Sequence, residues 1–140
     1  VDGRGLPVPL KVRAGAFMPI LWVATGHVFL SYMDDLAIVA LAEEEFGNGS
    51  KDQRASLQGK NPIEQLRKKV RKSGCAVIND TMLRGISAVA APIFDYTGRV
   101  TAVLTALGAT GGFDASADGV IASHVMRQAN DISAALGFSA

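Results

Sequence analysis

The spacing of apolar residues changes several times along the chain, and each change marks an expected element. Residues 7–13 alternate weakly and are rich in Val and Leu, which predicts a strand near a sheet edge. After a turn we expect a short helix over 24–33 and a second helix, capped by Asp34 and Asp35, that ends at Gly47. The apolar face expected on this second helix comprises Leu36, Val39, Ala40 and Phe46.

The stretch 48–60 is polar, contains two glycines and has no periodicity, which predicts an exposed loop. Asn61 then stands as an N-cap before Pro62, and Glu64 at the third helical position completes a variant of the capping box. The next helix is expected to end at Gly74. Its predicted buried stripe is Ile63, Leu66 and Val70.

The second half of the chain changes to strand periodicity. Residues 75–78 predict a short strand, and the apolar run 86–94 predicts a strand that is buried on both faces. The turn 95–98 leads to a return strand over 99–107, and the glycine-rich loop 108–112 follows. On the return strand, one face is expected to carry Val100, Ala102, Leu104 and Ala106, and the other Thr101, Val103, Thr105 and Leu107.

A final helix has a predicted buried stripe of Ala122, Val125, Ala129, Ile132 and Leu136. Together these elements predict an α+β domain with an antiparallel sheet, in which the hairpin 86–107 is central. The length of 140 residues fits one domain, and we expect residues 1–140 to form it.

The mean hydropathy alone would suggest a membrane protein, but the residue types that produce it do not. The mean hydropathy is +0.23, but 21 residues are Ala and only nine are aromatic, so the apolar content favours close packing of small side chains. The longest mostly apolar run, 17–33, is too short for a span and is interrupted by Pro19 and Gly26. The first residues lack the layout of a signal peptide, so we expect a cytoplasmic protein without membrane contact.

The charge balance excludes further classes. A net charge of +1 argues against a freestanding nucleic-acid binder. One cysteine cannot form an internal disulfide, and Cys75 fits a buried structural thiol better than a nucleophile. His27 and His124 lack the spacing of metal ligands, so we expect helix-surface or half-buried side chains and no metal site. One helix carries a basic cluster that fits a solvated face: Lys60, Arg67, Lys68, Lys69, Arg71 and Lys72.

The residues that best suit a site are small, apolar or hydroxyl-bearing. Thr101 and Thr105 share a strand face, and Thr25 and Gly26 stand at a helix start that could receive a carboxylate. Threonine is also simply a good strand residue, so the pattern alone leaves both interpretations open.

Three segments, in this order and spacing, carry a resemblance to a known family. They are Pro19-Ile-Leu-Trp-Val-Ala-Thr-Gly-His27, Arg71-Lys-Ser-Gly74 and Gly85-Ile-Ser-Ala-Val-Ala-Ala-Pro-Ile-Phe-Asp95, with Gly98 in the turn and Leu136-Gly137 at the end of the last helix. They resemble the effector-binding domain of the IclR family of bacterial transcription regulators. The corresponding family motifs are Pro-Leu-His-x-Thr-Ala-x-Gly-Lys, Arg-x-x-Gly and a strand ending in Ala-Ala-Pro-Val-x-Asp.

The resemblance covers nearly the whole chain from about residue 8 and implies a GAF-like or profilin-like fold, with helices on both faces of the sheet. It also implies an effector pocket against the sheet. Carried over position by position, that pocket comprises Leu21, Ala24, Thr25, Gly26, Ile78, Ala88, Thr105 and Leu107.

Departures from the family pattern indicate which class of ligand this chain would bind. Family members that bind very small acids place an acidic or hydroxyl-bearing group near the positions of Ile78, Ala88 and Leu107, which are apolar here. A buried, unpaired carboxylate would be costly among such side chains. A larger apolar or aromatic organic acid therefore fits better, with Thr25 and Thr105 as its polar anchors. The family's His and Thr in the first motif are Leu21 and Val23 here, and its Lys is His27.

We therefore expect a small-molecule effector-binding domain that also forms a homodimer or homotetramer, without catalysis and without a cofactor. Exposed apolar surface at the sheet edge or on the last helix is expected to supply the oligomer contact. Nothing before Val8 could form the family's winged helix-turn-helix, so we expect contact with DNA only through a domain absent from this chain. The alternative is a GAF-like sensory module of a signalling protein that binds a nucleotide or a partner protein. A third interpretation is an enzyme that uses Cys75 or a histidine.

Overall fold

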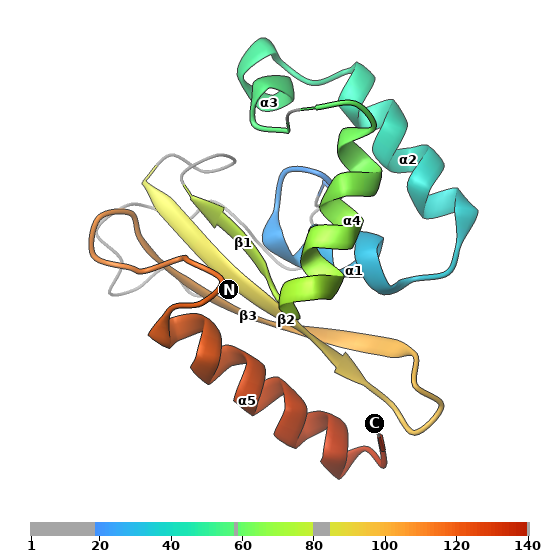
Figure 1. Cartoon of the computed structure of the whole chain (residues 1–140), viewed down its shortest axis with the longest axis vertical. Coiled ribbons are helices and arrows are strands. Elements are labelled where there is room, and N and C mark those ends of the chain that lie inside the picture. The colour runs from blue at the N-terminus through green and yellow to red at the C-terminus, as the bar shows by residue number, and fades with distance from the viewer. Residues whose placement is uncertain (1–18, 58, 80–84, 140) are drawn as a thin grey trace.

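A computed structural model of the chain describes residues 19–57, 59–79 and 85–139 (Figure 1). The strand predicted at 7–13 lies outside these residues. The helices are α1 (Ala24–Tyr32), α2 (Leu36–Gly47), α3 (Lys51–Ala55), α4 (Pro62–Ser73) and α5 (Val120–Ala135). The strands are β1 (Ala76–Asn79), β2 (Ile86–Phe94) and β3 (Val100–Ala109). No helix among the described residues is long and apolar enough to span a membrane.

The described strands form one antiparallel sheet in the order β1-β2-β3, which confirms the predicted antiparallel sheet and its β2–β3 hairpin; β2 is the central strand of the described sheet. The turn of this hairpin places Gly98 at a φ of 82°, in the left-handed region that glycine tolerates. The register shifts after Ile93, because Phe94 pairs with Val100 and Thr101 is left as an extra residue. The bulge corrects one prediction: Val100 packs with Val103 and Leu107 on the opposite face from Ala102.

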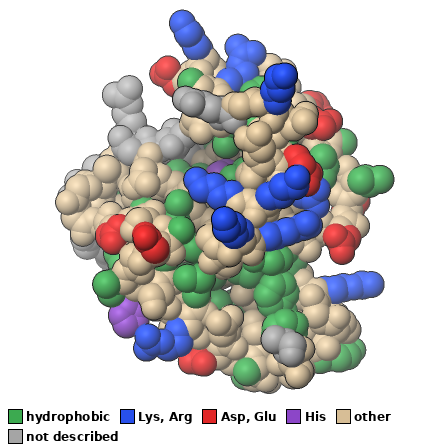
Figure 2. Space-filling model, in the orientation of Figure 1, with side chains coloured by type: hydrophobic (Ala, Val, Ile, Leu, Met, Phe, Trp, Pro, Cys, Tyr) green, Lys and Arg blue, Asp and Glu red, His purple; other side chains and the backbone are tan. Residues whose placement is uncertain are grey.

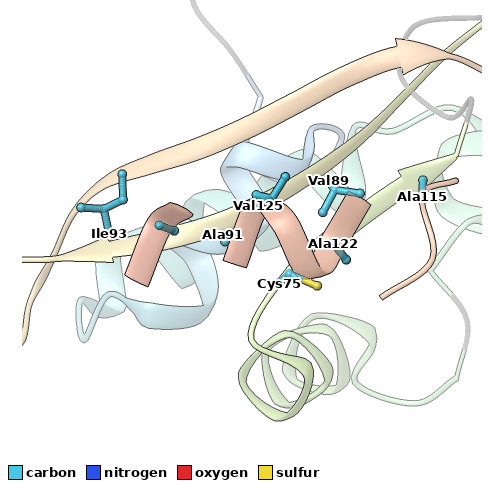
Figure 3. Close-up of a cluster of buried hydrophobic side chains, with 8 residues drawn as sticks. Cys75, Val89, Ala91, Ile93, Ala115, Ala122 and Val125 are labelled. Carbon is cyan, nitrogen blue, oxygen red and sulfur yellow. The ribbon is translucent and has the colours of Figure 1, made fainter. Parts of the chain in front are cut away.

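Helices cover both faces of the sheet, which confirms the predicted architecture (Figure 1). On one face, α5 packs on alternate residues of β2, namely Val89, Ala91 and Ile93 (Figure 3). On the other face, α1 and α4 pack on Ala88 and Ala90. β2 is buried on both faces along its whole length except at Phe94, and for this reason its sequence is almost entirely apolar.

A third cluster joins α1, α2 and α4 away from the sheet. Its buried members are Leu21, Trp22, Leu30, Ala42 and Ile63. The ring of Trp22 lies against Gly49, where an added Cβ would stand 2.8 Å from the ring. Glycine at this position therefore lets the loop after α2 close over the tryptophan.

The region 48–60 is not only a loop, contrary to the prediction. It contains α3, which Ser50 and Gln53 open with a reciprocal capping box. The capping box predicted at Asn61 does not form. Asn61 has a φ of 55° and makes no side-chain cap, so Pro62 alone marks the start of α4.

Two predicted helix faces also change. On α2, Leu36 and Ala40 are exposed, and Ala42 is the residue that becomes buried. On α5, Ile132 and Leu136 are 40% and 44% exposed, and the buried stripe runs through Ser133 instead. The last turn of α5 therefore approaches the sheet with a polar side chain, since Ser133 Oγ accepts a hydrogen bond from the Phe94 N–H at 2.9 Å.

The remaining boundaries follow the predictions closely. Asp35 caps α2 by accepting from the Ala37 N–H, and Gly74 ends α4 at a φ of 81°. The buried stripe of α4 includes Ile63 and Val70 as expected. The return strand extends to Ala109, two residues further than predicted, so the first glycine of the expected loop, Gly108, is part of β3.

Candidate functional site

Three of the predicted pocket residues form one row across the sheet. Ile78 of β1 pairs with Ala88 of β2, and Ala88 pairs with Leu107 of β3. All three side chains belong to the cluster on the face that α1 and α4 cover. Ala88 is the smallest of the three, so the row places one small apolar side chain between two larger ones. Register alone brings these residues together, because they are far apart in sequence.

The next row along the same face carries the polar pair. Ala76, Ala90 and Thr105 are aligned across the three strands. The hydroxyl of Thr105 lies 2.8 Å from that of Thr25, in the first turn of α1. The two threonines named as polar anchors therefore bond to each other, and their bond holds the start of α1 beside the apolar row.

The start of α1 has no side-chain cap. Val23 stands at the N-cap position, where its side chain offers no acceptor to the first-turn N–H groups. The positive end of the helix dipole thus lies in the turn where Thr25 contacts Thr105 of the sheet. Gly26 is required there by close packing, because an added Cβ would stand 2.3 Å from the Ile20 carbonyl oxygen. Ala24 is buried in the same cluster as Ala88.

Leu21 is placed differently from the other predicted residues. Its side chain is 1% exposed and packs in the α1/α2/α4 cluster, not with the apolar row. Its backbone, however, helps to fix the turn before α1. The Glu45 carboxylate accepts from the Ile20 N–H at 2.8 and 3.0 Å and from the Leu21 N–H at 3.0 Å. His27 Nε2 lies 2.6 Å from the Leu21 carbonyl oxygen.

His27 is fully buried, whereas we expected a half-buried side chain at most. Burial lowers the pKa of His27 below its ordinary value of 6.5, and the charge of Lys69 acts in the same direction against the raising effect of the Leu21 hydrogen bond. The neutral imidazole then donates from Nε2 to the Leu21 carbonyl oxygen. The Nδ1 atom has no hydrogen-bond partner, and His27 lines a cavity of about 30 Å³ that also contacts Lys69 and Cys75.

Basic residues of α4 hold the other end of α1. Arg67 Nε donates to the Leu30 carbonyl oxygen at 2.9 Å, and Arg71 Nε donates to the Ser31 carbonyl oxygen at 2.5 Å. These carbonyls belong to the last turn of α1 and have no partner within the helix. Two members of the predicted solvated basic face therefore have a structural role.

Three residues that position the candidate site were not predicted from the sequence: Glu45, Arg67 and Arg71. Glu45 follows two other glutamates, and only the fold shows which of the three turns inward. For the arginines, their spacing of four on a helix beside α1 is the one available signal, and lysine neighbours obscure it.

The described residues offer little support for catalysis or metal binding. They contain no group of three or more potential metal ligands among His, Cys, Asp and Glu. Cys75 is buried, and burial raises the pKa of its thiol, which keeps it protonated at neutral pH and unsuited to nucleophilic attack. The arrangement suits binding instead: an apolar floor, a hydroxyl pair and an uncapped helix start.

Two further hollows lie away from these residues. One, of about 350 Å³, lies between α2 and the start of α4 and has Phe46 and Ile63 in its wall. The other, of about 450 Å³, lies between the end of α1 and the β2–β3 turn and is lined by Tyr32 and Arg99 among others. Neither is lined by any predicted pocket residue, so both are separate from the apolar row.

Comparisons with known proteins agree with this architecture. A family model described as the bacterial transcriptional regulator IclR C-terminal matches residues 7–134. None of the curated proteins matches the chain. HmgR of Pseudomonas aeruginosa, a solved structure, is 28% identical with a TM-score of 0.77, and the match covers 95% of this chain and 51% of that one.

Two other solved structures share the fold at lower identity. The IclR protein of Thermotoga maritima is 22% identical with a TM-score of 0.73, over 96% of this chain and 53% of that chain. The second is the inducer-binding domain of PobR from Acinetobacter, solved as a double mutant in complex with 3-hydroxybenzoic acid. It is 21% identical with a TM-score of 0.63, and the match covers 83% of this chain and 66% of that chain. This chain spans about half the length of the HmgR and Thermotoga chains.

Proposed function

This chain belongs to the IclR family of bacterial transcriptional regulators, within the C-terminal domain of that family, and from that premise we propose that the sheet face under α1 binds an apolar or aromatic organic acid. The proposed site comprises the row Ile78–Ala88–Leu107, the Thr25–Thr105 pair and the start of α1, with the buried backbone of Leu21 behind them. Binding, not catalysis, is its role. Family membership favours this over a GAF-like module of a signalling protein.

The row Ile78–Ala88–Leu107 is the observation that carries the proposal. It provides an apolar surface with the small side chain of Ala88 at its centre, which suits a flat or aliphatic ligand body. The same floor disfavours acids of two or three carbons, whose carboxylate would be buried without a partner. A larger acid can rest its body on the row and place its carboxylate at the first-turn N–H groups of α1.

A thermal-shift titration tests the ligand class. Benzoate and 3-hydroxybenzoate, the latter chosen because the Acinetobacter domain was solved with it, are expected to raise the unfolding temperature, and glyoxylate and pyruvate are not. Calorimetry that shows tight binding of glyoxylate or pyruvate, with the aromatic acids inert, would contradict the proposal. Stabilisation by nucleotides alone would favour a signalling module instead.

A pair of variants on one strand localises the site. Thr105→Val removes the hydroxyl that bonds Thr25 and is expected to reduce the ligand-induced shift strongly while the fold survives. Thr101→Val is the matched control, because Thr101 is exposed at the bulge outside the proposed site. Equal responses of the two variants to the aromatic acids would show that the ligand binds elsewhere.

In the whole protein we propose that effector binding is coupled to DNA through a winged helix-turn-helix domain outside this chain. The effector would shift the population of arrangements in a homodimer or homotetramer and so change DNA affinity. We place this assembly in the cytoplasm. Gel-shift measurements on a full-length regulator, with and without the acid found by thermal shift, test the coupling.

A further inference from the structure

Helix α2 is poorly covered for its composition. Eight of its twelve residues are apolar, yet Ala42 is the single one that is buried. A helix that is apolar on all sides is normally enclosed by its surroundings. Here the outward face consists of Leu36, Ala37, Ala40 and Leu41, and the two leucines are 87% and 53% exposed. This outer face of α2 is thus an apolar surface of the kind that marks an interaction site.

Acidic residues flank the outer face of α2 at both ends. Asp34 and Asp35 precede it, and Glu43 and Glu44 follow it, and all four are exposed. Among the described residues, the pair of Arg67 with Glu64 is the ion pair that forms, so none of these four carboxylates has a cationic partner. A partner surface that binds this face must therefore carry basic groups and also apolar side-chain segments that can pack on the leucines.

The chain presents a basic surface on α4. Lys68, Lys69, Arg71 and Lys72 are exposed along this helix. Figure 2 shows Lys and Arg side chains gathered on the face where Figure 1 shows α4, with acidic and apolar side chains beside them where it shows α2. A net charge of only +1 therefore conceals two opposite patches on neighbouring helices.

From this complementarity we infer that the outer face of α2 binds the basic face of α4 on a second copy of this chain. A two-fold axis then forms both α2–α4 contacts at once, because each copy contributes one patch of each sign. The leucines of α2 pack on the aliphatic stems of the facing lysines, whose charged ends meet the flanking carboxylates. Pairing of α2 with α2 is disfavoured, since it would bring acidic groups together.

This inference deepens the proposed function, because it assigns the surface of the proposed assembly. It assigns the contact to α2 and α4, whereas the sequence led us to expect it at the sheet edge or on the last helix. On α5 the exposed apolar residues Val120, Ile132 and Leu136 do not form one stripe, and polar residues separate the first from the other two.

Sedimentation velocity on the 140-residue chain tests the inference by charge reversal. The wild-type chain is expected to dimerise more weakly at high salt, as screening requires. Glu43→Lys with Glu44→Lys, and separately Lys68→Glu with Lys72→Glu, should each raise the dissociation constant by about tenfold or more. Mixing these two double variants should restore association as a heterodimer, because each reversed patch then meets its opposite. Glu45 and Arg71, which hold α1, stay unchanged.

The controls separate this inference from the proposed function. Val120→Ser removes an equally exposed side chain on α5 and should leave the dissociation constant unchanged, whereas Leu36→Ser with Leu41→Ser should raise it. Circular dichroism confirms that each variant is folded, and the benzoate thermal shift is measured on all of them. The inference is overturned if the chain stays monomeric at every concentration. It is also overturned if neither charge reversal changes the dissociation constant of the dimer. Loss of the benzoate response with dimerisation intact bears only on the ligand site.

Discussion

Helices α5 and α1, which pack on opposite faces of the sheet, are held there by different means. α5 is held mainly by interdigitation of small apolar residues, where Ala122 and Ala129 allow close approach to Val89 and Ala91, and by one hydrogen bond from β2 to Ser133 near its end. α1 also packs on alanines, but polar groups fix its two ends: Glu45 and His27 act at its start, and two arginines act at its end. Packing resists any displacement, whereas hydrogen bonds from side chains permit a helix to be released at one end. This difference supports our proposal that the ligand acts at the face under α1.

The strongest disruption is expected on the α5 side. Ile93→Ala should lower the free energy of unfolding by about 3 kcal/mol, because it opens a cavity in a close-packed cluster. Chemical denaturation measures the loss. Ile132→Ala, on the exposed part of α5, is the control and should change the stability by less than about 0.5 kcal/mol. Equal losses would mean that α5 is not docked on this face.

On the α1 side, Glu45→Gln should have a smaller and more local effect. The amide retains one oxygen but loses the charge that receives two backbone N–H groups, so we expect a loss of about 2 kcal/mol. Hydrogen exchange should accelerate at Ile20 and Leu21 and stay unchanged in α5. Glu44→Gln, on the exposed neighbouring residue, should leave these amides protected as in the wild type.

At the other end of α1, Arg71→Met should cost about 1 kcal/mol, the value of one hydrogen bond to a carbonyl. Lys72→Met is the matched control, since Lys72 is exposed and adjacent. Thermal unfolding of both variants measures the difference. If the two variants lose equal stability, the basic residues of α4 act only through their charge.

The smallest expected effect is a dependence on pH through His27. Burial lowers its pKa, so between that value and 6.5 the unfolded state binds more protons than the folded state. Stability therefore falls as the pH is lowered through this window, by less than about 1 kcal/mol between pH 7 and pH 6. The free energy of unfolding, measured at several pH values, should show this decrease for the wild type and for the His124→Gln control. The His27→Gln variant should not show it.

The sequence predicted the parts of the fold that local pattern determines. The spacing of residues correctly predicted the buried strand β2, the turn at Gly98 and the buried stripe of α4. α3 was missed although Ser50 and Gln53 stand at capping-box spacing, because no apolar periodicity follows them. At Asn61 the opposite occurred: the right residues stand in order, but the backbone adopts a left-handed conformation that prevents the cap.

The candidate site was predicted less completely, for a physical reason. The contact of Thr25 with Thr105 joins residues 80 positions apart, and strand register decides which side chains share a row. Resemblance to a family suggested the residues, whereas only the fold shows that Ile78, Ala88 and Leu107 are aligned and that the side chain of Leu21 belongs to another cluster.

Trp22 gives the molecule its own optical reporter. It is the one tryptophan of the chain, it is 5% exposed, and it lies in the turn that Glu45 anchors and that leads into α1. Its emission at excitation wavelengths selective for indole therefore arises from a single, dry environment next to the proposed site. A change in how α1 begins would shift or quench that emission without any label, whereas events confined to α5 would leave the spectrum unchanged.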